Sequence, residues 1–139
     1  MAYKDLSFGF ILRSNVGNYV YNNIYSNRGF YNNLFGTGYN NNSSSNVLES
    51  GFVKGTLEPR LSDYYVQNAS FLRMDNINLG YNLSDLIGLK KVRTQLTLNI
   101  QNVFVMTNYK GLDPEVKDGI DKQVYPRPRT FSVGLNVNF

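Results

Sequence analysis

The final stretch of the chain, residues 129–139, constrains the fold more than any other segment. Apolar side chains occupy every second position there, and small or polar side chains fill the positions between them. The apolar residues are Phe131, Val133, Leu135, Val137 and Phe139. Because side chains alternate between the two faces of a β-strand, this stretch predicts one strand with an apolar face and a polar face.

Two architectures use such a strand. A soluble antiparallel sheet packs its apolar face against a core. A transmembrane β-barrel turns the apolar face to lipid and lines its lumen with polar side chains. The last strand is compatible with both, so the rest of the chain has to distinguish them.

Composition favours strands over helices. The 139 residues suggest one domain and include 11 Tyr and 9 Phe but no Trp, with many Asn residues. No window of about 18 consecutive apolar residues occurs, so no membrane-spanning helix is predicted. The absence of Cys excludes disulfides and thiol chemistry. The net charge of +4 is spread along the chain without an aromatic platform, so no nucleic-acid partner is expected.

Alternation predicts four strands, at about 4–13, 71–83, 92–104 and 129–139. The polar faces of the last three are rich in amides, which suit a lumen better than a core. The lumen-facing candidates are Asn76, Asn78, Asn99, Gln101, Asn136 and Asn138. Within 71–83, the charged Arg73 and Asp75 continue the apolar face, as expected where a strand leaves the lipid.

The connections differ in length. Residues 14–70 and 105–128 are predicted as long outer loops, and 84–91 as a short inner turn. The first loop has weak helical spacing between 19 and 35, and its low-complexity stretch 40–46 is expected to be mobile. Long loops on one side and short turns on the other are typical of outer-membrane barrels. The predicted fold class is therefore all-β, with antiparallel up-and-down strands and a long outer loop that holds a short helix.

Several segments resemble the SusC/RagA family of TonB-dependent outer-membrane transporters. The similar segments are Ser70–Tyr81, Gln101–Val116 and Tyr125–Phe139, with a looser match at Gly17–Asn22. The resemblance implies a 22-stranded barrel plugged by an N-terminal domain, of which this chain is the last four strands. Family members are several times longer, so the chain looks like a C-terminal fragment without signal peptide, plug or TonB box.

The resemblance also implies a function and partners. Family members import glycans or peptides at the bacterial outer membrane with a SusD-like surface lipoprotein. The TonB complex supplies energy through N-terminal parts that this chain lacks. Phe139 resembles the terminal aromatic residue that the barrel-assembly machinery reads. By this resemblance the segment is a scaffold with outer loops, set in outer-membrane lipid, and not a transporter by itself.

Other site chemistry is sparse. The loop aromatics, candidates for contact with substrate or lipoprotein and alternatively for packing within the loop, include Tyr19, Tyr21, Tyr25 and Tyr31. The acidic loop suits either a calcium site or solvated turns, in which Arg127 and Arg129 pair with the carboxylates; its acids are Asp113, Glu115, Asp118 and Asp121. We assign no cofactor and no metal.

Catalysis has no support in the sequence. The chain contains no His and no Cys, and no Ser lies in a nucleophile motif. The alternative function is a soluble β-domain that binds glycans through the aromatic loop. That alternative requires the long loop to cover the apolar face of the strands.

Overall fold

The computed structural model describes residues 2–29, 45–49, 62–84, 92–122 and 125–138. The chain divides into two compact units. The first, the sheet unit, comprises Met1–Asn15, Phe71–Met106 and Arg127–Phe139. The second, the loop unit, comprises Val16–Ser70 and Thr107–Pro126.

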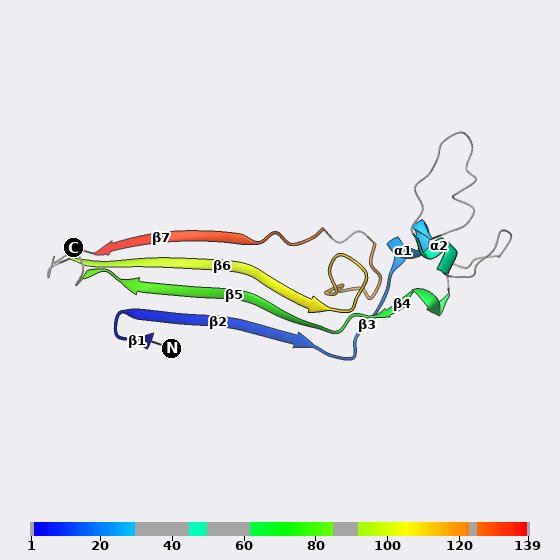
Figure 1. Ribbon diagram of the computed structural model, residues 1–139, viewed down its shortest axis with the longest axis horizontal. Coiled ribbons are helices and arrows are strands. Elements are labelled where there is room, and N and C mark those ends of the chain that lie inside the picture. Colours follow the sequence, from blue (N-terminus) through cyan, green and yellow to red (C-terminus); the bar gives the residue numbers. More distant parts are fainter. Residues whose placement is uncertain (1, 30–44, 50–61, 85–91, 123–124, 139) are drawn as a thin grey trace, which may run out of the picture. The chain divides into compact units, whose positions relative to one another are not determined.

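The sheet unit is built from a five-stranded sheet with the strand order β1-β2-β5-β6-β7. The direction of the strands alternates from β2 to β7 (Figure 1). The strands are β1 (Ala2–Tyr3), β2 (Leu6–Asn15), β5 (Phe71–Asn82), β6 (Arg93–Thr107) and β7 (Thr130–Asn138). This architecture confirms the predicted all-β class with antiparallel up-and-down strands.

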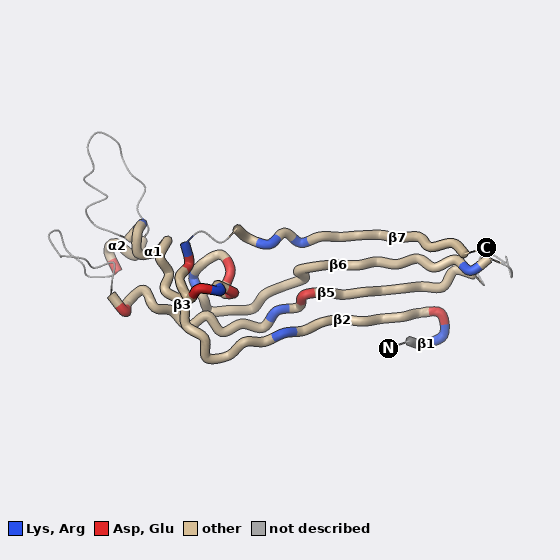
Figure 2. The backbone as a smooth tube through the Cα atoms, turned by 180° about the vertical axis from the view of Figure 1, so that it is seen from behind, with Lys and Arg blue, Asp and Glu red and all other residues tan. Residues whose placement is uncertain are grey.

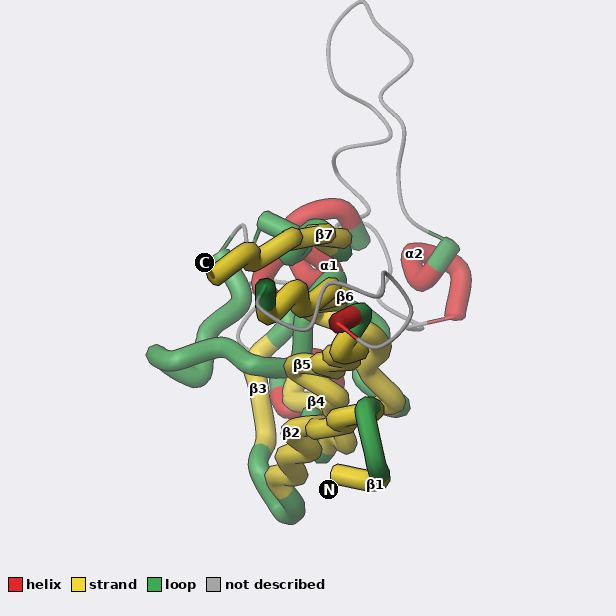
Figure 3. Tube along the Cα trace, turned by 90° about the vertical axis from the view of Figure 1, so that its left-hand side faces the viewer, coloured by secondary structure: helices red, strands yellow, loops and turns green. Residues whose placement is uncertain are grey.

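The register places the apolar side chains of neighbouring strands on one face. Phe8 lies opposite Leu79, and Leu98 lies opposite Val133. Directly opposite residues of antiparallel strands share a face. This apolar face contains the exposed side chains of Leu6, Phe8, Phe10, Leu12, Leu79, Leu96, Phe131, Val133, Leu135 and Val137. Within the sheet unit, β2, β5, β6 and β7 follow one another in a single layer (Figure 3).

The alternation is interrupted in β5 by a β-bulge. Ile11 pairs with Asn76 but Leu12 pairs with Met74, so Asp75 is an extra residue in β5. An extra residue reverses which face the following side chains take. Met74 therefore joins the apolar face beside Leu12, and Arg73 lies opposite Arg13 on the polar face. The expectation that Arg73 and Asp75 continue the apolar face is wrong, because period-two alternation stops at the bulge.

A second irregularity lies in the neighbouring strand β6. Asn102 has a φ of 52°, in the left-handed region that Asn adopts more readily than most residues. The consecutive residues Gln101 and Asn102 both line one cavity on the polar face. In a regular strand, consecutive side chains project to opposite faces. The alternation of side chains in β6 is therefore also shifted by one residue at Asn102.

The loop unit contains short elements around a small core. They are β3 (Tyr19–Tyr21), α1 (Asn23–Arg28), α2 (Asn46–Glu49), a 3₁₀ helix η3 (Asp63–Tyr65) and β4 (Val66–Asn68). β3 pairs with β4, and Val20, Ala69, Tyr109 and Val116 pack together. Helix α1 begins after Asn22, whose side-chain Oδ1 accepts a 2.9 Å hydrogen bond from the Tyr25 N–H. Such a cap satisfies a backbone donor that the first helical turn leaves open.

Several predictions fall outside the described residues. They concern Phe139, Tyr31, most of the turn 84–91 and most of the low-complexity stretch. Asn46, the last residue of that stretch, begins α2 and is fully buried. No helix in the described ranges is long and apolar enough to span a membrane.

Candidate functional site

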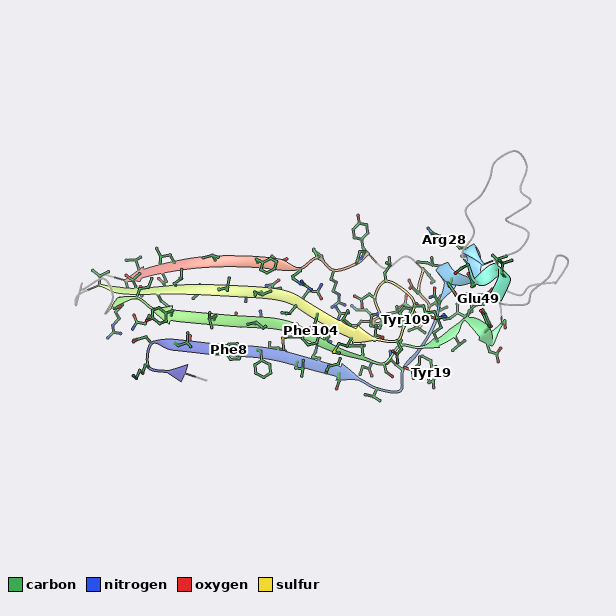
Figure 4. All side chains as sticks on the ribbon, in the orientation of Figure 1. Phe8, Tyr19, Arg28, Glu49, Phe104 and Tyr109 are labelled. Carbon is green, nitrogen blue, oxygen red and sulfur yellow. The ribbon has the colours of Figure 1, made fainter. Side chains whose placement is uncertain are left out.

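The first candidate site is the apolar face of the sheet unit. Its side chains on β7 are more than half exposed at three positions: Phe131 at 65%, Val133 at 73% and Leu135 at 64%. Figure 4 labels Phe8, which extends from β2 on the same face. Contiguous exposed apolar patches of this extent mark contacts with membranes or with other proteins. This face therefore needs an apolar environment.

The opposite face carries the predicted amides. The Asn99 side chain donates to the Asn78 Oδ1, and the Asn78 side chain donates to the Asn76 Oδ1. In the pairing of β6 with β7, Asn136 lies opposite Gln95 and Asn138 opposite Arg93. The structure thus gathers the predicted amides of these strands on one polar face, which the hydrogen bonds tie together across β5 and β6.

The polar face ends in a charged cluster where the two bulges lie. Arg13 forms a bidentate ion pair with Asp75, in which its Nη2 donates to Oδ1 at 3.0 Å. Arg73, only 2% exposed, donates to the Asn102 Oδ1 at 3.2 Å, and the Asn102 amide donates to the Arg127 carbonyl. Figure 2 shows these charged positions on β2, β5 and the segment before β7. A cavity of about 410 Å³ lies among them.

The second candidate site is a cavity of about 720 Å³ within the loop unit. Helix α1 and the loop after β6 provide its walls. Ligand pockets commonly measure about 300–1,000 Å³, so this cavity has the size of a small-molecule site. Its lining includes two tyrosines, two cations and one buried carboxylate: Tyr25, Tyr125, Arg28, Lys110 and Asp121.

Backbone hydrogen bonds bring the two walls together. The Tyr21 N–H donates to the Gly119 carbonyl at 2.8 Å, and the Asp121 N–H donates to the Tyr21 carbonyl at 2.9 Å. These two bonds form a parallel bridge between β3 and the loop after β6. The Lys110 N–H also donates to the Gln67 Oε1 at 3.3 Å. The backbone segments that carry the lining residues are therefore joined by hydrogen bonds.

Two buried side chains, Tyr109 and Asp121, form a hydrogen-bonded pair in the loop after β6. The hydroxyl of Tyr109, a residue labelled in Figure 4, donates to the Asp121 Oδ2 at 2.8 Å, and Asp121 is fully buried. Burial raises the pKa of the Tyr109 hydroxyl, and the hydrogen bond to Asp121 raises this pKa further. A Cβ at Gly111 would overlap the Tyr109 ring and lie 2.7 Å from the Asp121 Oδ2. Only glycine fits beside this pair.

The acidic loop is not uniformly solvated. Asp113 is 3% exposed, and its Oδ1 accepts a 2.9 Å hydrogen bond from the Glu115 N–H. Asp118 is exposed, whereas Asp121 belongs to the buried pair. Among the described residues no three His, Cys, Asp or Glu side chains gather as metal ligands do. Two of the four acids therefore shape the loop.

The predicted contact tyrosines take different roles. Tyr19 is 61% exposed, whereas Tyr21 and Tyr25 pack edge-to-face on Tyr65 with ring centroids 6.2 and 6.3 Å away. Of these, only Tyr25 lines the larger cavity. Sequence reasoning missed Arg28, Lys110 and Tyr125 as its neighbours, because distant segments contribute them and no local pattern connects them.

Comparisons with known proteins place the chain in a family. No family model matches the sequence. It is 42% identical to the TonB-dependent receptor SusC of Bacteroides thetaiotaomicron, across 100% of this chain and 14% of that receptor. It is 30% identical to the TonB-dependent receptor P26 of Formosa agariphila, across 100% of this chain and 16% of that receptor. The chain belongs to the SusC/RagA family of TonB-dependent transporters.

Solved structures agree with this SusC/RagA assignment. The structure of the RagAB peptide transporter matches 99% of the chain with a TM-score of 0.73 and 27% identity. The RagAB peptide importer in its closed-closed state matches with a TM-score of 0.74. The chain covers 16% of the matched chain in both. As a SusC/RagA member it is a bacterial outer-membrane protein, and it spans only about a seventh of the curated relatives' length.

Proposed function

We propose that this chain is the C-terminal barrel segment of a TonB-dependent importer of glycans, with peptides as the alternative cargo. The observation that carries the proposal is the single-layer sheet whose apolar face is exposed along four long strands. In water such a face is unfavourable, since each buried aliphatic or aromatic side chain contributes ~1.5–3 kcal/mol. In a barrel wall lipid covers it.

In this arrangement the polar face of the sheet lines the lumen of the barrel. The amides of the polar face, Asn76, Asn78, Asn99, Gln101, Asn136 and Asn138, line the interior of a barrel that we expect to have 22 strands. The segment supplies wall and outer loops and does not transport by itself. The loop unit is the part of this chain that meets cargo or partner, through Tyr19, Tyr21, Tyr25 and Tyr31.

The partners follow from the same assignment. A SusD-like surface lipoprotein contacts the outer loops, and the TonB complex acts through N-terminal parts outside this chain. The barrel-assembly machinery recognises Phe139, the aromatic residue that follows β7. The structural match to the RagAB peptide transporter supports a transporter that works together with a partner protein. The RagAB match is to a peptide transporter, which keeps peptides as the alternative cargo.

The alternative is a soluble domain that binds glycans through its aromatic loop. It requires the long loop to cover the apolar face. Phe8, Val133 and Leu135 are exposed within the sheet unit. Enzymatic activity has no support in the relatives, which are named as receptors, or in the side chains of the described cavities.

The test uses the whole receptor that contains this chain, expressed in its own outer membrane. We expect the receptor to show heat-modifiable mobility in electrophoresis, to copurify with a surface lipoprotein and to take up labelled oligosaccharides when TonB is present. Removing residues 127–139 should abolish assembly and uptake together. A receptor fraction that is monodisperse in buffer without detergent and lacks heat-modifiable mobility would refute the proposal.

A further inference from the structure

The larger cavity of the loop unit has positive side chains without matching acids. Arg28 is exposed in the last turn of α1, and Lys110 is exposed at the start of the loop after β6. Among the described residues, neither has a carboxylate within ion-pair distance. Asp121 is the single acid in the lining, and its Oδ2 already accepts the Tyr109 hydroxyl. The wall therefore presents an excess of positive charge to a ligand.

Two acids near this wall have to be considered. Glu49 on α2 is close enough to Tyr25 to act on its hydroxyl, but Glu49 does not line the cavity. Asp121 belongs to the lining but is fully buried, and its Oδ2 already accepts the Tyr109 hydroxyl. Figure 4 shows Arg28 on α1 and Glu49 on α2. Arg28 and Lys110 therefore remain the charged groups accessible from the cavity.

The same cavity has aromatic and aliphatic surfaces beside its cations. The Lys110 Nζ lies 5.8 Å from the centroid of the Tyr25 ring, which keeps the ammonium group next to an aromatic wall. Tyr125, 90% exposed, and Leu112, 63% exposed, belong to the same lining. Aromatic rings offer an apolar face to stack on and a hydroxyl to hydrogen-bond. A ligand that fits has both an apolar face and an anionic group.

The framework of the cavity is ordered before a ligand arrives. The buried Asn22 side chain caps α1 and donates to the Gln67 Oε1 at 3.4 Å. The same Gln67 oxygen accepts the Lys110 N–H. Preorganised side chains lower the entropy that binding costs. Gln67 Oε1 thus links Asn22, which caps the helix that carries Tyr25, to the backbone of Lys110.

We propose that this cavity binds a carboxylate-bearing ligand, with Lys110 and Arg28 on the carboxylate and the Tyr25 and Tyr125 rings against the adjoining sugar ring or side chain. The carboxylate comes either from an acidic sugar or from a peptide. This inference rests on the proposed function, because it assigns a cargo class to the outer loops of the importer. Arginine and lysine bind carboxylates by charge-assisted hydrogen bonds, which are about twice as strong as neutral ones.

The experiment measures ligand binding to the whole receptor, purified in detergent, by isothermal titration calorimetry. The probes are trigalacturonate, the neutral galactose trisaccharide, and a short peptide with either a free or an amidated carboxyl terminus. We expect at least one carboxylate probe to bind. Its neutral counterpart should bind with a Kd that is at least roughly tenfold higher. Selective binding of trigalacturonate identifies the acid as a sugar, and selective binding of the free peptide identifies it as a peptide.

Variants assign the binding to this cavity. Lys110→Gln and Arg28→Gln should each raise the Kd roughly tenfold. Lys117→Gln, an exposed lysine of the same loop outside the lining, is the matched control and should leave the Kd unchanged. Equal binding of charged and neutral probes, or unchanged binding by both cavity variants, overturns the inference. Heat-modifiable mobility of the same samples reports barrel assembly separately, so loss of the proposed function is recognised independently of ligand binding.

Discussion

A lysine placed on each face of β6 tests the assignment of the two faces. Leu98 lies opposite Val133 on the apolar face, and the adjacent Asn99 lies opposite Ser132 on the polar face. The two substitutions Leu98→Lys and Asn99→Lys introduce the same side chain into the same strand at neighbouring positions. They differ in the face on which the new charge projects and in the side chain that is removed.

The expected magnitudes are well separated. A lysine on the lipid face near the middle of the bilayer costs ~2–4 kcal/mol. Asn99→Lys places its charge on the wet face and removes the hydrogen bond to Asn78, which contributes ~0.5–1.5 kcal/mol. The difference is about 2 kcal/mol, which corresponds to a roughly 30-fold change in the folding equilibrium constant. Typical folds have only ~5–15 kcal/mol of net stability, so the lipid-face variant should lose much of its assembled population.

The assay is membrane assembly of the whole receptor, scored by heat-modifiable mobility and by the urea concentration at the unfolding midpoint. Leu98→Lys should assemble poorly, and Asn99→Lys should assemble close to the unmodified level. The pair Val133→Lys and Asn136→Lys repeats the comparison on β7. Equal assembly of the two variants in each pair, or the reverse order, would refute the assignment of the faces.

Three further predictions concern the bulges and the loop unit. Asn102→Val should lower the unfolding midpoint more than Asn102→Asp, because a β-branched residue at a φ of 52° is strained by ~1–2 kcal/mol and loses the acceptor for Arg73. Tyr109→Phe should cost ~1.5–3 kcal/mol of local stability near neutral pH, measured by amide hydrogen exchange at Asp121. Since the folded-state pKa of Tyr109 is raised, that contribution is complete below about pH 10 and is lost as the pH rises through the raised value, so the difference between the two proteins should shrink only in strong alkali. Gly111→Ala should accelerate the same exchange by displacing the Tyr109 ring, whereas Gly9→Ala, with no atom within 4 Å of its new Cβ, should not.

The strands and their faces could be predicted because the signal is local. Val133 and Leu135 alternate with Gly134 and Asn136, and a strand converts this alternation directly into two faces. The apolar positions of neighbouring strands also fall on the same face, since Leu98 lies opposite Val133 in the register. The apolar face could therefore be assembled from four separate stretches without knowledge of the loops.

The larger cavity could not be predicted, because its residues converge only through the folded backbone. Tyr25 lies on α1, and Lys110 lies on the loop that follows β6. The hydrogen bonds between Tyr21, Gly119 and Asp121 bring these segments together, and nothing in the spacing of the sequence encodes them. The abundance of aromatic residues indicated Tyr25 as a candidate contact residue, but it does not predict which cations lie beside Tyr25.

The bulge in β5 shows how one strand can hold both the residues of the apolar face and charged residues. Without the extra residue, strict alternation would put Arg73 on the same face as Ile77 and Leu79. On the lipid face that charge would cost ~2–4 kcal/mol at mid-bilayer depth and less near the interface. The register shift instead turns Met74 outward beside Leu12 and brings Arg73 to the polar face.

The change of phase in β6 completes this arrangement. Because Asn102 changes the phase of β6 beside the bulge of β5, its side chain reaches the buried Arg73 and accepts a hydrogen bond from it. A buried guanidinium needs such acceptors, since an unsatisfied charge in a low-dielectric site is costly. The two irregularities therefore act together: one moves the charge from the apolar face to the polar face, and the other provides a partner for it there.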